Sequence, residues 1–394
     1  MDKRVDCLKR IRRLGYSSTD ILPAVMSSMD YSMEKPLATG RRSLVSASGS
    51  IVDVEFNASS LPKHVWVDTD LWARMEARLQ TDARQERYKV ARSVLFTYRP
   101  FPGWTRVDDW IQLRPVAVAL EDATSHNLVP GWPHAGYPNP FLIEVKYRDT
   151  DLIFLEGERR IRAVQEAGWL LAGFLDIAVF QLRAPYVWTF SQGKYSLMVT
   201  GMGTGLDGIS DEFSDVGDIA PMALTDTKTY YHELGVTTNV FRVPDLSSLY
   251  SRYKELTLKD RMRFLRVCAS LMDASDPNAS ESQRVVGLVS ALEPLAKAPV
   301  QCPSCGGKVG ITKAFGELLD QYVKPTPEVR HWYMKLYALR SSIVHGSWRY
   351  DVDESFWSTS DTKSIMPLIA WGSAKQGAIN WLLAQTQGIK PTAG

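Results

Sequence analysis

Apolar residues recur with a helical period through the segment that spans residues 330–348. The apolar positions that share one face are Trp332, Leu336, Leu339 and Ile343. Spacings of three and four residues predict an amphipathic helix with that face buried. Gly346 follows directly and predicts the end of the helix.

A second face of this predicted helix also carries large side chains. Its members are Tyr333, Tyr337, Arg340 and Val344. A helix with two faces of this kind is expected to be buried twice, once in its own bundle and once against a partner chain.

Four further segments of the C-terminal part show the same period. They cover residues 258–272, 285–295, 311–322 and 368–385. In the first of them, the residues expected on the buried face are Leu258, Met262, Leu265, Cys268 and Met272. The succession of such segments predicts a helical bundle with antiparallel neighbours, and Asp245 is expected to cap a helix before them.

The N-terminal part mixes alternating and helical patterns. Strands are expected within residues 44–56 (with a turn at Gly49), 94–103, 141–147, 151–155, 177–182, 186–190 and 195–200. Helices are expected over the basic N-terminal 25 residues and over 70–91 and 157–174. The fold class predicted from these patterns is α+β, with a mixed α+β region over 1–240 and an all-α bundle over 241–394.

Composition narrows the functional classes. The 394 residues include 45% hydrophobic and 23% charged residues, and the formal net charge is +2, so a site for RNA has to be a local patch. Four cysteines do not form a disulfide framework in a chain of this length. The sequence shows neither a secretory signal nor a membrane span, and a cytoplasmic protein without a membrane partner is expected.

The stretch LYALRSSIVHG, residues 336–346, resembles the signature of the HEPN superfamily, and is most similar to its ApeA-like branch. The family motif is an arginine, a polar residue, variable residues and a histidine, which Arg340, Ser341 and His345 match. Residues 263–274 and 285–295 resemble the preceding helices of the family. The resemblance covers about the last third of the chain.

This resemblance implies an endoribonuclease of prokaryotic anti-phage defence that needs no metal or other cofactor for catalysis. It implies an RNA substrate and a homodimer or higher homo-oligomer, in which two helices form a composite site. It also implies that the N-terminal region senses a phage-derived trigger or holds the nuclease inactive.

The residue types fit this chemistry. RNA carries its own nucleophile in the 2′-hydroxyl, so His345 could move a proton while Arg340 stabilises charge on the phosphoryl oxygens. Ser341 is expected either to contact the phosphate or to cap the helix turn. Glu293, the acid expected to be most buried, could orient Arg340 or His345 through a charge-assisted hydrogen bond.

The geometry leaves a second hypothesis open. Five residues separate Arg340 from His345, which places them about 140° apart on an ideal helix. In the alternative, the chain is a non-catalytic helical dimerisation or RNA-binding module. Arg340 then pairs with an acid, and His345 serves only as an end cap.

Cys302 and Cys305 form a Cys-Pro-Ser-Cys-Gly turn that resembles one knuckle of a zinc ribbon. A structural zinc site needs about four ligands, and the chain has no second Cys-x-x-Cys pair. A histidine or another protomer would have to complete the site. The alternative is an empty or redox-capable hairpin.

Overall fold

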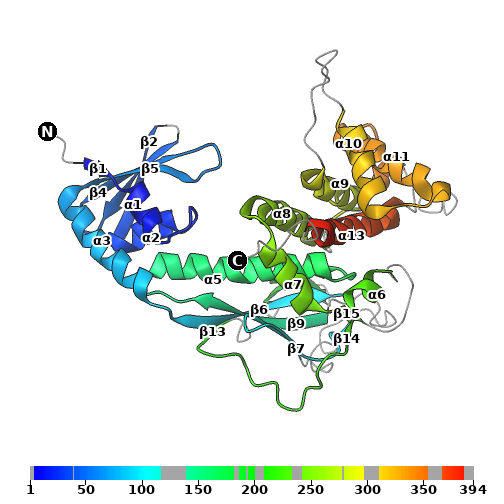
Figure 1. Ribbon diagram of the computed structural model, residues 1–394, viewed down its shortest axis with the longest axis horizontal. Coiled ribbons are helices and arrows are strands. Elements are labelled where there is room, and N and C mark those ends of the chain that lie inside the picture. The colour runs from blue at the N-terminus through cyan, green and yellow to red at the C-terminus, as the bar shows by residue number, and fades with distance from the viewer. Residues whose placement is uncertain are drawn as a thin grey trace, which may run out of the picture. The chain divides into compact units, whose positions relative to one another are not determined.

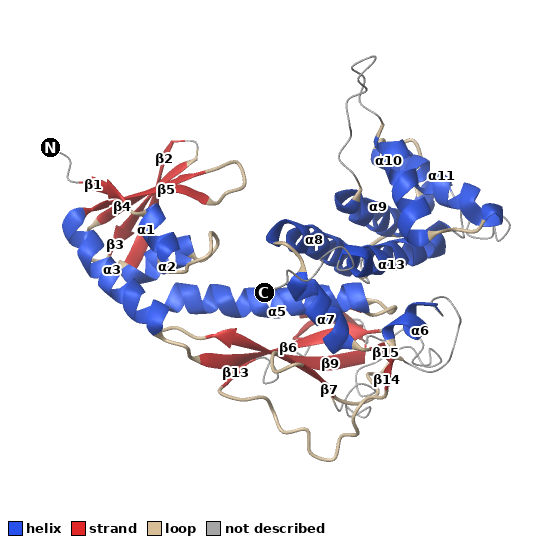
Figure 2. Cartoon of the chain, in the orientation of Figure 1, coloured by secondary structure: helices blue, strands red, loops and turns tan. Residues whose placement is uncertain are grey.

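The computed structural model describes residues 4–38, 40–116, 139–181, 186–191, 194–199, 208–232, 242–276, 279–296, 310–353 and 366–385. The fold class is α+β, with sheets in the N-terminal part and helices in the C-terminal part (Figure 2). The chain forms two compact units. The first comprises Met1–Ala91, Val145–Val164 and Ile209–Phe213, and the second comprises Arg92–Glu144, Gln165–Gly208 and Ser214–Gly394. The functional boundary expected near residue 240 stays a prediction.

The first unit contains a five-stranded antiparallel sheet in the order β1-β5-β4-β3-β2. Its strands are β1 (Arg4–Asp6), β2 (Tyr31–Ala38), β3 (Arg41–Ser46), β4 (Ile51–Phe56) and β5 (Pro62–Asp68). Its helices are α1 (Leu8–Arg13), α2 (Ile21–Ser28) and α3 (Thr69–Arg84). The strands expected within 44–56 are confirmed as parts of β3 and β4, which pair with each other, and Gly49 supplies a positive φ of +83° at the predicted turn.

Alternation along the strands builds the core of this unit. Val52 and Val54 of β4 are buried with Val65 and Val67 of β5, and Met75 of α3 is also fully buried. Burying one such side chain stabilises the fold by about 1.5–3 kcal/mol.

The N-terminal helix is shorter than expected. Val5 lies in β1, where it pairs with Val67 of β5, so the helix begins only at Leu8. The sheet register therefore overrides the local helical pattern at this position.

A second sheet has six strands, in the order β10-β6-β9-β8-β7 with β13 paired to β6. The strands are β6 (Tyr88–Thr97), β7 (Thr105–Val107), β8 (Ile111–Pro115), β9 (Asn139–Arg148), β10 (Val179–Phe180) and β13 (Gly208–Ser210). Two smaller pairs are β11 (Tyr186–Ser191) with β12 (Lys194–Val199), and β14 (Leu224–Thr225) with β15 (Val243–Pro244).

The strand expected over residues 151–155 is wrong, because helix α5 (Ile153–Phe174) begins inside it. The Thr150 hydroxyl accepts a 3.0 Å hydrogen bond from the Leu152 amide, and the Glu156 amide donates to the Leu152 carbonyl at 2.8 Å. These bonds start the first helical turn. A short apolar run does not by itself distinguish a strand from a buried helix.

The C-terminal part is helical. Its elements are α6 (Thr227–His232), α7 (Leu246–Glu255), α8 (Leu258–Ala274), α9 (Glu281–Leu292), η1 (Glu293–Leu295), α10 (Ile311–Leu318), η2 (Leu319–Val323), α11 (Pro327–Val344), α12 (Tyr350–Asp353) and α13 (Met366–Gln385). Helix α9 packs against α8, α11 and α13, which together form a bundle (Figure 1). Asp245 caps α7 as predicted, because its carboxylate accepts from the Ser248 amide at 3.1 Å.

The buried face of α8 differs from the prediction. Leu258 is 74% exposed and Met262 is 44% exposed, whereas Phe264, Val267 and Leu271 are fully buried. Helix α8 packs against both α9 and the C-terminal half of α5. Because two neighbours cover it, its buried apolar stripe is wider than a single neighbour would require. The stripe also begins later in the helix, beyond Leu258 and Met262.

Lys375 of α13 holds the C-terminal end of α5. Its ammonium is fully buried and donates to the carbonyls of Ala172 and Leu175, the second at 2.8 Å. Such carbonyls have no partner within their own helix, so the lysine satisfies them. Burial lowers the pKa of Lys375 to about 7.

Within the described part of the chain, no helix combines the length and apolar character needed to cross a bilayer.

Candidate functional site

Helix α11 carries the arginine-histidine motif. Pro327 occupies its first turn, where the missing amide proton has no helical partner in any case. His345 is the C-terminal cap, and Gly346 follows with a φ of +71°. The Gly346 amide donates to Ile343 at 3.0 Å and the Ser347 amide to Ser342 at 2.9 Å, which is the Schellman pattern. The helix end predicted at Gly346 is therefore confirmed.

Arg340 lies half-buried near this end and contacts two side chains from an earlier part of the bundle. Its Nη2 is 3.2 Å from Oε1 of Glu293, and its Nε donates to the Ser290 hydroxyl at 3.2 Å. Its guanidinium carbon also lies 5.8 Å from the centre of the Tyr337 ring. Three neighbours, from α9, η1 and α11 itself, thus hold the guanidinium in place.

The contact between Arg340 and Glu293 is an ion pair without hydrogen-bond alignment. Glu293 Oε1 is buried and has no hydrogen-bond partner among the described residues. The two side chains are 24% and 31% exposed, so the pair contributes about 1 kcal/mol or less to stability. Its main effect is to restrict the orientation of the arginine.

Glu293 is more exposed than expected. Among the described residues, the acid with no exposed surface is Glu144 of β9, which accepts from the Gln112 amide group at 2.7 Å and from the Ser214 amide at 3.2 Å. Glu293 begins η1, directly beyond the last turn of α9, and in that segment Leu295 is the buried residue.

His345 is exposed at the end of α11. Its backbone amide donates to the Ser341 carbonyl at 3.0 Å. Within the described residues, its imidazole has no hydrogen-bond or ion-pair partner. Of the two residues that Glu293 was expected to orient, it therefore contacts only Arg340. Ser341 itself is half-buried. One chain therefore brings together Arg340 and Glu293 and leaves His345 open to solvent.

The second face of α11 is partly occupied by its own chain. Tyr337 packs against Phe315 of α10 with ring centres 5.4 Å apart. Burial raises the pKa of the Tyr333 hydroxyl, which is only partly exposed. Val344 is 51% exposed and Val329 is 38% exposed. On this face, the exposed side chains are therefore the two valines, whereas the tyrosines are partly buried.

Ser290 is a site residue that the sequence did not reveal. It precedes Glu293 by three positions, so both belong to neighbouring turns of one helical segment, and Arg340 bridges them. Only the pairing of α9 with α11 identifies it, and no local motif signals that pairing.

Cys302 and Cys305 lie outside the described residues. Cys7 and Cys268 are free and buried, and burial raises the pKa of the Cys7 thiol to about 12. No group of three metal-ligating side chains occurs within the part of the chain that the structure describes. The zinc hypothesis stays a prediction.

The arrangement around α11 offers a fixed cation and a solvent-accessible imidazole five residues apart. The cation can bind a phosphate oxygen, and the imidazole can accept or donate a proton. No protein-family model matches the sequence, and no curated protein or solved structure shows significant similarity to it.

Proposed function

We propose that the chain is a metal-independent endoribonuclease of the HEPN type that acts in prokaryotic anti-phage defence. The observation that carries this proposal is the placement of Arg340. Glu293 and Ser290 steady its guanidinium near the capped end of a helix, five residues before the exposed His345.

The proposed reaction is a transfer within the RNA. The 2′-oxygen attacks the adjacent phosphorus, and the bond from phosphorus to the 5′-oxygen breaks. The 2′-hydroxyl loses a proton and the leaving 5′-oxygen gains one, and His345 performs one of these two transfers. Arg340 stabilises the charge on the non-bridging phosphoryl oxygens. The products are a 2′,3′-cyclic phosphate and a 5′-hydroxyl end.

We further propose that two copies of α11 complete the site. Arg340 and His345 point about 140° apart on one helix, so a second copy can supply the group that one chain directs away from the substrate. The exposed Val344 and Val329 support a contact along this helix. The homodimer, the cytoplasmic location and an N-terminal region that responds to a phage-derived trigger are parts of this same proposal.

One observation favours a second candidate, a non-catalytic dimerisation or RNA-binding module. Arg340 already has an acidic partner, and His345 has no described partner to orient its ring. The two candidates differ in what happens to bound RNA. Incubating purified protein with labelled RNA and identifying the ends of any product separates them, because a binding module leaves the RNA intact.

A further inference from the structure

Helix α1 of the first unit presents a cluster of exposed basic side chains. Its members are Lys9, Arg10, Arg12 and Arg13. The apolar residues of the same helix, Leu8 and Ile11, are buried in the core of the unit. Because successive helical residues are about 100° apart, the four cations share one continuous face that spans about 160°. We call it the basic face of α1.

The charges of the basic face are uncompensated. Among the described residues, none of its four side chains has a hydrogen-bond or ion-pair partner. The acid that is nearest in the sequence, Asp6, is already engaged. Its carboxylate lies 2.7 Å from Nδ1 of His64 and accepts from the amides of Leu8 and Val65, each at 3.2 Å.

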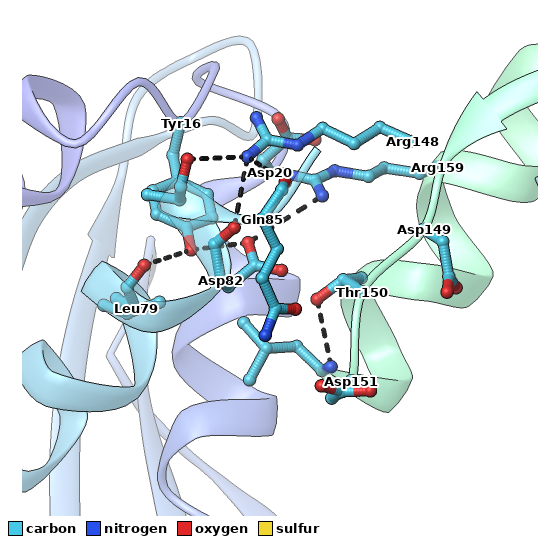
Figure 3. Close-up of polar contacts among 12 residues, drawn as sticks. Tyr16, Asp20, Leu79, Asp82, Gln85, Arg148, Asp149, Thr150, Asp151 and Arg159 are labelled. Atoms are coloured by element: carbon cyan, nitrogen blue, oxygen red, sulfur yellow. Dashed lines mark hydrogen bonds and ion pairs between the residues drawn. The ribbon is translucent and has the colours of Figure 1, made fainter. Parts of the chain in front are cut away.

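Other arginines of the first unit do have structural partners, and two of them lie at the end of α3 (Figure 3). Arg148 donates to three backbone carbonyls there, those of Asp82, Ala83 and Gln85, at 3.1, 2.9 and 3.1 Å. Arg159 lies 3.8 Å from Oδ2 of Asp82. These two arginines satisfy groups that the fold leaves open, whereas the cations of the basic face satisfy none within the described chain.

Helix α1 is fixed to the rest of the unit at both ends. The Cys7 amide, before the helix, donates to the Val65 carbonyl of β5 at 2.9 Å. Tyr16, after the helix, is 5% exposed, and its hydroxyl lies 2.7 Å from Oδ2 of Asp82 and 2.9 Å from the Leu79 carbonyl (Figure 3). The basic face is therefore preorganised, which lowers the entropy lost when a partner binds.

Crowding like charges on one helix has a cost. Lys9 and Arg13 are four positions apart, and Arg10 and Arg13 are three apart, so their charges repel each other across one turn. The helix dipole favours cations in the last turn, but it leaves the repulsion between them in place. A polyanion bound on this face would relieve that repulsion.

The chemistry of the face favours phosphate groups on a nucleic acid over a bilayer surface. Three of its four members are arginines, whose planar guanidinium matches the oxygens of a phosphate. A helix that binds a bilayer surface also needs exposed apolar side chains. Within residues 4–30, all of which the structure describes, no large apolar side chain is more than partly exposed.

We propose that the basic face of α1 binds the phosphodiester backbone of a nucleic acid without reading its sequence. The four cations contact the non-bridging phosphate oxygens. The formal net charge of the whole chain is only +2, so a local cluster of this kind is what attracts a polyanion. This inference goes beyond the proposed nuclease, because it assigns binding to a different unit and holds whether or not RNA is cleaved.

The test is fluorescence anisotropy on the full chain with His345→Ala, which separates binding from any cleavage. The probes are a labelled RNA and a labelled DNA of the same mixed sequence, each at several KCl concentrations. We expect saturable binding whose logarithm falls linearly with the logarithm of the salt concentration. Tighter binding of RNA identifies RNA as the ligand, and equal binding of both shows that the phosphates alone are recognised.

Variants locate the site. Arg12→Gln with Arg13→Gln should weaken binding at least about tenfold and make the salt slope shallower by about 1.4–1.8, because two phosphate contacts are lost. Lys9→Gln with Arg10→Gln removes the other half of the face and should act in the same way. Arg74→Gln with Arg84→Gln removes the same net charge from exposed positions on α3 and should leave binding unchanged.

Urea midpoints check that each double variant is folded, which is expected because all the replaced side chains are exposed. The proposal is overturned if neither nucleic acid binds, or if both α1 variants bind as tightly as the parent. It is also overturned if the α1 and α3 variants weaken binding equally, or if vesicles of phosphatidylserine and phosphatidylcholine bind more tightly than either nucleic acid.

Discussion

Glu293 places its Oε1 3.2 Å from Nη2 of Arg340, a contact between residues that lie 47 positions apart in the sequence. Glu293 begins η1, and Arg340 lies in the penultimate turn of α11. Because Ser290 holds the Nε of the same guanidinium, the arginine has a defined position before any substrate arrives. Such preorganisation reduces the entropy lost when a phosphate binds.

Replacing Glu293 by Gln should lower the rate of RNA cleavage by about tenfold while the fold stays intact. The pair is partly exposed, so its loss should cost about 1 kcal/mol of stability or less. Initial cleavage rates and urea midpoints measure the two effects. Glu317→Gln, an exposed change on α10, is the matched control. A Glu293→Gln protein that cleaves at the parent rate would show that the acid does not position Arg340.

Val344→Asp should weaken self-association and cleavage together. The side chain is 51% exposed, so the charge costs little within one chain but would be buried in a dimer through α11. Sedimentation velocity at several concentrations measures the dimer, with Leu258→Asp on α8 as the control because Leu258 is 74% exposed. A monomeric Val344→Asp protein with full activity rules out the composite site. Tyr337 is a poorer probe because it packs against Phe315 in its own chain.

Two glycines of α5 should respond in opposite directions to alanine. A Cβ at Gly173 would lie 2.5 Å from the sulfur of Cys268, so Gly173→Ala should destabilise the protein by about 1–3 kcal/mol. A Cβ at Gly157 meets no described atom within 4 Å, so Gly157→Ala should stabilise by about 0.5–1 kcal/mol. Thermal unfolding of the two variants measures both. Equal shifts would show that α5 and α8 do not pack as described.

The sequence was most informative where local signals and burial agree. The spacing of Leu336 and Leu339, together with Gly346, predicts most of α11 and its end, and the Val285 to Leu295 pattern predicts α9. These features follow from helical periodicity and cap chemistry, which act over a few residues.

Long-range pairing could not be predicted in the same way. Val5 lies in a strand because it pairs with Val67 of β5. Leu258 is exposed because α8 packs against α5 and α9 through other residues. Ser290 becomes a site residue only through the contact of α9 with α11. Periodicity shows which residues share an apolar or a polar face of an element. It does not show which other element that face packs against.

Lys375 should give the protein a measurable pH dependence of stability. Burial lowers its pKa to about 7, from an ordinary value of 10.5. Between these values the unfolded chain binds more protons than the folded one, so stability should rise with pH. The parent should therefore gain stability relative to Lys375→Met as the pH rises from 7 to 9. The gain in unfolding free energy should be up to about 1.4 kcal/mol per pH unit. A difference that stays constant over this range contradicts the burial of a titrating ammonium.

His345 and Arg340 should both be needed for cleavage. His345→Ala and Arg340→Ala should each lower cleavage by at least about a hundredfold, because a proton transfer and the stabilisation of phosphoryl charge are lost. The His345 change should leave the unfolding midpoint unchanged, since its side chain is exposed. His331→Ala, an exposed histidine on the same helix, is the control.

The most direct measurement is the chemical nature of the ends that the parent protein produces from a labelled RNA in the presence of EDTA. Mass spectrometry should find 2′,3′-cyclic phosphate and 5′-hydroxyl ends, and these products should disappear with folded His345→Ala while His331→Ala retains them. Intact RNA with the parent protein, or the same products at the parent rate with His345→Ala, would contradict the assignment.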